Sequence, residues 1–117
     1  MNLTGKRVAV LGAGRSGRAA ADLALRNGGK VVVYDSGSEE VFDGLRDEIR
    51  CHPRANEETG KACAADLVVI SPGIETSGEF ASSFARGAGE FIGETEFASR
   101  YFDGLVIGIT GTNGKTT

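Results

Sequence analysis

Two glycine-rich segments of the chain contain the residue types that bind phosphate groups. The first, Gly12-Ala13-Gly14-Arg15-Ser16-Gly17, fits the pattern GxGxxG and follows an apolar run. In this pattern the first glycine allows a tight turn, the second lets a diphosphate approach the backbone, and the third lets a helix pack closely on a strand. Backbone N–H groups at the start of that helix would point at the phosphates. The alternative is a glycine turn that serves packing alone.

Two polar residues, Asp35 and Ser36, directly follow the next apolar run, at 30–34. An acid in this place accepts hydrogen bonds from a ribose in dinucleotide-binding enzymes. It could equally accept one from the N–H of a uracil ring. Because Asp-Ser-Gly is also a turn-forming sequence, a purely structural role stays open. With the glycine loop upstream, the pair favours a nucleotide site.

The second glycine-rich segment is Gly111-Thr112-Asn113-Gly114-Lys115-Thr116-Thr117, after an apolar run at 105–110. Its Gly-Lys-Thr matches the end of a Walker A motif, in which lysine neutralises phosphate charge and threonine binds magnesium. The strict pattern GxxxxGK[ST] is not met, because position 109 is isoleucine. We nevertheless expect an ATP loop, with Lys115 as the catalytic residue and Thr116 as a ligand of Mg²⁺. The alternative is a polar tail.

Short apolar runs alternate with longer amphipathic stretches, and these elements must position the loops. The apolar runs predict strands at 7–11, 30–34, 67–71, 90–92 and 105–110, with a short strand near Cys51. Helical spacing predicts helices at 16–27, 39–50, 56–64, 77–87 and 95–101. Strands that alternate with helices indicate the α/β class, here a Rossmann-like open parallel sheet with helices on both faces.

Composition excludes several classes of function. The 117 residues carry a net charge of −3 with scattered cations, so we expect no nucleic-acid partner and no membrane surface. No apolar run approaches the roughly 20 residues of a transmembrane helix. No signal peptide precedes the first strand, so we expect a cytoplasmic protein in which Cys51 and Cys63 are reduced. The adjacent Cys51 and His52 lack metal-site spacing.

The second loop, with the apolar strand before it, resembles the ATP loop of the Mur ligase family and of the folylpolyglutamate synthases. TGTNGKTT, at 110–117, is typical of the whole superfamily. Four further segments occur in the order and spacing of the branch that adds D-glutamate: Gly12 to Gly17, Asp35-Ser36, Ser71-Pro72-Gly73-Ile74 and Gly93-Glu94-Thr95-Glu96. The resemblance covers the entire chain.

The resemblance implies a role for each matching position. The loop from Gly12 to Gly17 would hold the diphosphate of a UDP-sugar, Asp35 and Ser36 would recognise uracil, and Gly73 would approach the nucleotide sugar. Gly111 to Thr117 would bind ATP with Mg²⁺. Family members often have a hydrophobic residue where Arg15 stands, so Arg15 would either contact the diphosphate or point into solvent.

The resemblance also implies a reaction and an organisation of the chain. ATP would phosphorylate the carboxylate of UDP-N-acetylmuramoyl-L-alanine, and the amine of D-glutamate would then attack. Residues 1–103 would form the UDP-sugar domain, and 104–117 the first strand and phosphate loop of a central ATP-binding domain. We expect a monomer, and no ligase activity from these 117 residues alone. Residues 111–117 would be mobile in the absence of a following helix.

Three alternatives stay open from the sequence. The L-alanine-adding branch of the family usually has histidine where Asn113 stands. An NAD-dependent oxidoreductase domain would explain GxGxxG and Asp35, but would leave TGTNGKTT without a role. A regulatory nucleotide-sensing module is the third.

Overall fold

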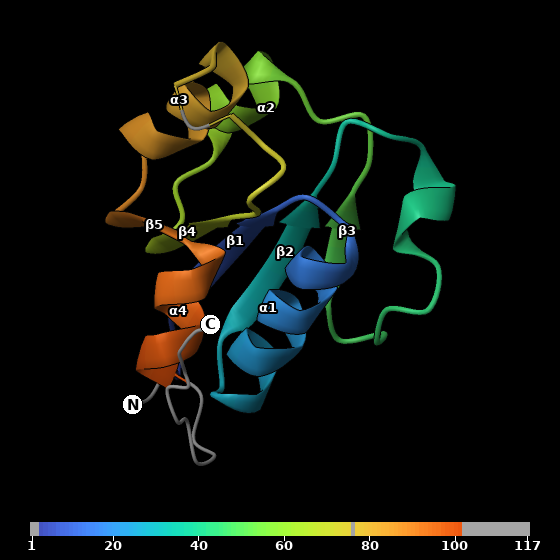
Figure 1. Ribbon diagram of the computed structural model, residues 1–117, viewed down its shortest axis with the longest axis vertical. Helices are drawn as coiled ribbons and strands as arrows, with labels where there is room; N and C mark the ends of the chain where they lie inside the picture. Colours follow the sequence, from blue (N-terminus) through green and yellow to red (C-terminus); the bar gives the residue numbers. More distant parts are fainter. Residues whose placement is uncertain (1–2, 76, 102–117) are drawn as a thin grey trace, which may run out of the picture.

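Five parallel strands form one sheet in the computed structural model, which describes residues 3–75 and 77–101 (Figure 1). The spatial order of the strands is β3-β2-β1-β4-β5. Their bounds are β1 Arg7–Leu11, β2 Lys30–Tyr34, β3 Arg50–His52, β4 Leu67–Ile70 and β5 Glu90–Gly93. The chain reverses direction across the sheet between β1 and β4. In such sheets the loops diverge at this point and leave a crevice at the carboxyl ends of the strands.

Helices lie on both faces of the sheet, as predicted. One face packs against α1 (Arg15–Arg26) and α4 (Glu94–Tyr101), through a core that includes Val10, Val33 and Phe97. The opposite face packs against α3 (Glu79–Arg86), where Phe84 is fully buried, and α3 in turn packs on α2 (Glu57–Ala62).

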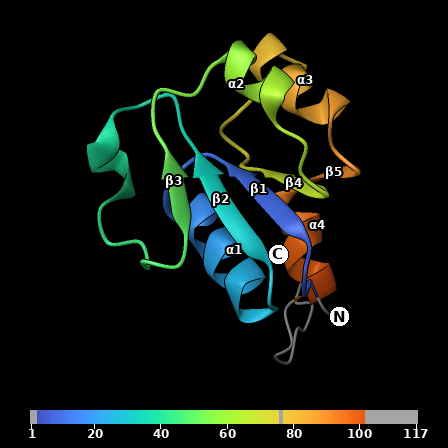
Figure 2. The ribbon, with the colours of Figure 1, turned by 180° about the vertical axis from the view of Figure 1, so that it is seen from behind.

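The second face is only partly covered. Seen from behind, α2 and α3 lie over one end of the sheet, and none of the helices among the described residues crosses the strands β1, β2 and β3 on this side (Figure 2). Parallel sheets are usually buried on both sides. A hollow of about 550 Å³ lies on this face, with Arg7, Lys30 and Arg50 among its lining residues.

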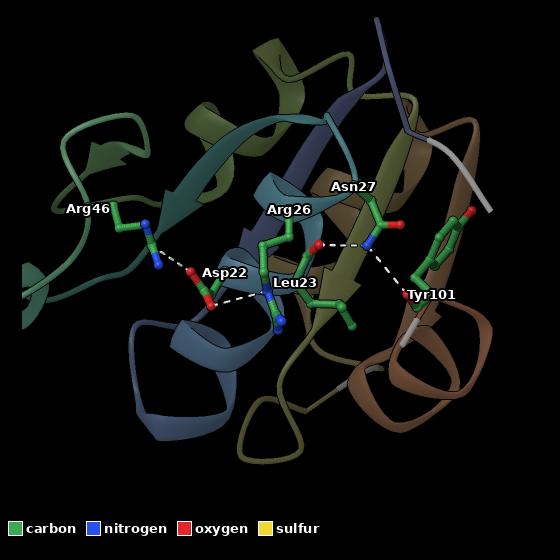
Figure 3. A network of polar contacts seen from close by, with 6 residues as sticks. All are labelled: Asp22, Leu23, Arg26, Asn27, Arg46 and Tyr101. Carbon is green, nitrogen blue, oxygen red and sulfur yellow. Dashed lines mark hydrogen bonds and ion pairs between the residues drawn. The ribbon is translucent and has the colours of Figure 1, made fainter. Parts of the chain in front are cut away.

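Helix α1 buries one side, which includes Ala20, Leu23 and Ala24. Its end is fixed by Asn27, whose side-chain amide donates to the carbonyl of Leu23 at 2.8 Å and to that of Tyr101 at 3.3 Å (Figure 3). The chain then turns at Gly28, whose φ of +90° suits glycine. The end of α1 is thereby joined to the end of α4.

The predicted helix at 39–50 is wrong. The chain forms a 3₁₀ helix over Glu39–Phe42, then turns, and reaches β3 at Arg50. Gly44 interrupts the helical pattern with a φ of +89°. Phe42 and Ile49 are buried on either side of that turn, so their helical spacing reflects two separate core contacts.

The remaining predicted elements within the described residues are confirmed. The ambiguous region after Cys51 contains the short strand and the short helix that were expected, as β3 and α2. Asn56 and Thr59 form a capping box at the start of α2. The expected strand at 105–110 lies outside the described residues. Within the described part, no helix is long and apolar enough to cross a membrane.

Candidate nucleotide-binding site

An open cleft of about 590 Å³ lies at the carboxyl ends of β1, β2 and β4. This size is in the range of small-molecule sites. Its walls come from the turn after β1, the turn after β2, the turn after β4 and the start of α3. The lining residues are Gly12, Gly14, Ser16, Tyr34, Asp35, Ser36, Ser71, Gly73, Ile74 and Phe80.

The glycine loop takes the conformation that its sequence predicts. Gly12 has a φ of +106°, which disfavours any residue with a side chain, and its N–H donates to the carbonyl of Tyr34 at 2.7 Å. Gly17 lies so close to the same turn that an added Cβ would be 1.9 Å from the carbonyl oxygen of Gly12. Gly14, in contrast, has open space around it. The three glycines therefore serve the turn, the helix packing and the approach of a ligand.

The start of α1 offers unpaired N–H groups to the cleft. Gly14 is the N-cap residue, and no side chain caps it in the described part of the protein. The first N–H bonded within the helix is that of Arg18, which donates to Gly14. The preceding N–H groups, including that of Ser16, have no acceptor within the helix. Together with the positive end of the helix dipole, they form an anion site.

Asp35 connects the turn after β2 to the glycine loop. Its Oδ2 accepts from the N–H of Ala13 and its Oδ1 from the N–H of Gly37, each at 2.8 Å. The Ala13 amide therefore faces Asp35 rather than the cleft. Since each carboxylate oxygen has a second lone pair, Asp35 can still accept a bond from a ligand.

Ser71 presents an unsatisfied polar atom at the cleft. Its Oγ is buried and has no hydrogen-bond partner among the described residues. It lies beside the glycine loop, where a Cβ on Gly12 would be 2.9 Å away. Native structures rarely leave a buried hydroxyl without a partner, so this oxygen indicates a group that the site receives. The sequence placed Ser71 at the end of the predicted strand 67–71 and did not predict it as a site residue. That position, at the end of an apolar strand beside the glycine loop's strand, was the available signal.

Tyr34 lies between the cleft and the hollow on the partly covered face of the sheet, because it lines both. Its ring meets Phe84 edge-on, with centroids 4.9 Å apart, and lies 5.2 Å from the ring of His52. Burial, together with the neighbouring thiol of Cys63, raises the pKa of Tyr34 to about 12. The phenol is therefore neutral at physiological pH and adds no negative charge to an anion site.

The structure brings most of the predicted substrate residues together. Gly12, Gly14, Ser16, Asp35, Ser36 and Gly73 line the cleft. Three others do not. Ala13 is buried, Gly17 packs against Gly12, and Arg15 is exposed to solvent. The predicted ATP-binding residues, 111–117, lie outside the described residues.

Comparison with known proteins decides the family. A family model described as the N-terminal domain of MurD-like Mur ligases matches residues 6–92. The chain belongs to the MurD-like Mur ligases. This family's N-terminal domain accounts for all five strands of the described sheet except the last residue of β5.

Relatives of this MurD-like domain agree in name. Proteins called UDP-N-acetylmuramoylalanine--D-glutamate ligase are 38% identical in Geobacter metallireducens and 43% in Pelodictyon phaeoclathratiforme, over the whole of this chain. One in Chlorobium phaeobacteroides is 41% identical over 97% of the chain. The chain spans only 27%, 25% and 24% of the lengths of these three relatives.

Replacing Gly17 with alanine is predicted to destabilise the MurD-like domain, since the new Cβ would meet backbone that cannot move freely. We expect a loss of about 2 kcal/mol or more in the free energy of unfolding, measured by urea titration. Gly14→Ala is the matched control and should cost less than about 1 kcal/mol, because its surroundings are open. Equal losses in the two variants would contradict the assigned roles.

Raising the pH should lower the free energy of unfolding through the ionisation of Tyr34. Its folded-state pKa of about 12 lies above the ordinary value of 10.0, so the stabilisation is complete below pH 10 and is lost as the pH rises toward 12. Unfolding free energy measured across this window should fall more steeply for the native protein than for Tyr34→Phe. Parallel curves would show that the phenol titrates normally.

Proposed function

We propose that the cleft binds the UDP moiety of a UDP-N-acetylmuramoyl-L-alanine substrate, as the N-terminal domain of a D-glutamate-adding ligase. The observation that supports this most directly is the convergence of uncapped N–H groups of α1 and the unpartnered Ser71 hydroxyl on one cleft. Both are hydrogen-bond donors, and a diphosphate supplies acceptors with negative charge.

The polar and apolar walls fit the other parts of such a ligand. Asp35 and Ser36 lie at the end of β2, where a carboxylate can accept from the N–H of a uracil ring. Ile74 and Phe80 provide apolar surface on the opposite side, from the turn after β4 and from α3. Gly73 has no neighbour within 4 Å of an added Cβ, which leaves room for a bulky sugar.

The complete protein would join D-glutamate to the muramoyl-alanine carboxylate at the expense of ATP. The relatives' names support this amide-bond-forming activity. ATP would supply the activating phosphate and Mg²⁺ would neutralise its charge, with Lys115 and Thr116 as the residues that the sequence assigns to them. The cleft's part in the reaction is positional: by holding the nucleotide, it restricts the carboxylate at the far end of the substrate. We propose a cytoplasmic, monomeric enzyme, of which the 117 residues alone would have no ligase activity.

The NAD-dependent alternative receives no support from the comparisons, since the relatives quoted are all named as ligases. The same names favour D-glutamate over L-alanine as the added amino acid.

Ligand titration tests the proposal directly. Calorimetry on the full-length protein should detect binding of UDP-N-acetylmuramoyl-L-alanine and no binding of NADH. ATP-dependent phosphate release should then require D-glutamate and should not occur with L-alanine. Binding of NADH with no response to the UDP-sugar would overturn the proposal, and turnover with L-alanine would reassign the branch.

Replacing Ser71 with alanine should separate ligand affinity from protein stability. Removing a buried hydroxyl that has no partner should leave the free energy of unfolding unchanged or slightly higher. The affinity for the UDP-sugar should fall by about tenfold, the effect of one lost hydrogen bond to a charged group. A loss of stability with full affinity would show that the hydroxyl has a partner inside the protein.

A further inference from the structure

Arg18 is held in an unusual way for a surface cation. It lies in the second turn of α1 and is half-buried. Its Nε donates to the carbonyl of Ala13 at 3.0 Å, its Nη1 to that of Asp43 and its Nη2 to that of Val41, both at 2.5 Å. No carboxylate forms an ion pair with it in the part of the chain that the structure describes. Its three hydrogen bonds all go to backbone carbonyls.

The three carbonyls belong to two segments that adjoin the cleft, although none of the three residues lines it. Ala13 is part of the glycine loop, whereas Val41 and Asp43 belong to the segment that follows Asp35 and Ser36. The planar guanidinium can hold three acceptors in a fixed arrangement, which a lysine ammonium cannot reproduce. Arg18 therefore ties the glycine loop to the segment that follows Asp35 and Ser36.

Other contacts also hold the segment 37–44. Phe42 is buried, Val41 packs against the core, and the N–H of Arg54 donates to the carbonyl of Gly37 at 2.8 Å. The segment's ion pair between Glu39 and Arg54 is largely exposed, and pairs of that kind add little rigidity. Gly44, with its positive φ, allows the chain to turn back directly after the bonded carbonyls, and an added Cβ there would lie 3.5 Å from Nη1 of Arg18.

Both backbone polar groups of Ala13 are hydrogen-bonded to charged side chains. Its N–H donates to Asp35 and its carbonyl accepts from Arg18. The glycine loop is thus tied to the end of β2 by a carboxylate, and to the segment after it by a guanidinium. Both ties involve the backbone, so they fix the loop's position without occupying the N–H groups at the start of α1.

We propose that Arg18 is a positioning residue. By tying the glycine loop to the segment after β2, it holds the start of α1, which would bind the diphosphate, and the turn at Asp35 and Ser36, which would bind the base, at the spacing of one UDP moiety. The inference rests on the proposed function for the identity of the ligand. Arg18 would then account for the gain in UDP affinity that arises when the glycine loop and the turn after β2 bind their parts of the ligand at the same time. That gain is lost when the two subsites no longer match the ligand's length.

The test compares a joined ligand with its parts. Uridine, inorganic pyrophosphate and UDP are titrated separately into the full-length protein and its Arg18→Met variant by NMR or calorimetry. We expect UDP to lose about tenfold or more in affinity, while each fragment loses less than about twofold. Arg18→Lys should behave like the methionine variant, because the three donors of an ammonium sit on one nitrogen and cannot reach carbonyls that the guanidinium contacts with three separate nitrogens. Arg26→Met, an exposed change on the same helix, should leave all three affinities unchanged.

A second readout does not depend on the ligand. Hydrogen exchange of the backbone amides in residues 37–44 should accelerate in Arg18→Met and stay constant in Arg26→Met. Unchanged exchange would overturn the proposal. The proposal would also fail if pyrophosphate alone lost as much affinity as UDP, because Arg18 would then act only as a positive charge that attracts phosphate. If the native protein bound neither UDP nor uridine, the proposed function would fail, and the exchange measurement would still decide the role of Arg18.

Discussion

The first turn of α1 leaves backbone N–H groups that the helix cannot satisfy, and the site is arranged around that constraint. A side-chain cap would satisfy them, but Gly14 stands at the cap position and has none. The unpaired groups stay available only because the loop is glycine at each critical place. Gly12 makes the turn, Gly17 lets the helix lie against it, and Gly14 keeps the approach open. The helix start is thus left available for an anion rather than satisfied by a side chain.

The sheet topology supplies the other half of the site. Because β1 and β4 are neighbours while the chain leaves them in opposite directions, the turns after them diverge and form a crevice. Parallel pairing places Leu11 beside Ile70 and Tyr34, so the residues that follow, Gly12, Ser71 and Asp35, come together. Residues far apart in sequence therefore meet at one edge of the sheet.

The backbone ties around Ala13 show how a small domain makes a loop rigid without occupying its binding groups. Asp35 and Arg18 both hold backbone atoms of the glycine loop, one from each adjacent segment. Charged groups form stronger hydrogen bonds than neutral ones, so two such ties restrain a loop that contains three glycines. The walls of the cleft are then set by the fold before any ligand arrives, which lowers the entropy lost on binding.

The sequence alone determined the fold class, the glycine loop, the pair Asp35-Ser36 and nine of the ten elements in the described residues, because periodicity and glycine placement are local signals. It failed at 39–50, where Phe42 and Ile49 satisfy helical spacing but contact the core from either side of Gly44. Only the tertiary structure decided that the Ser71 hydroxyl has no partner among the described residues and that Arg18 donates to backbone carbonyls of two segments. Both depend on contacts between segments distant in the chain, and no local pattern encodes which carbonyl a guanidinium will reach.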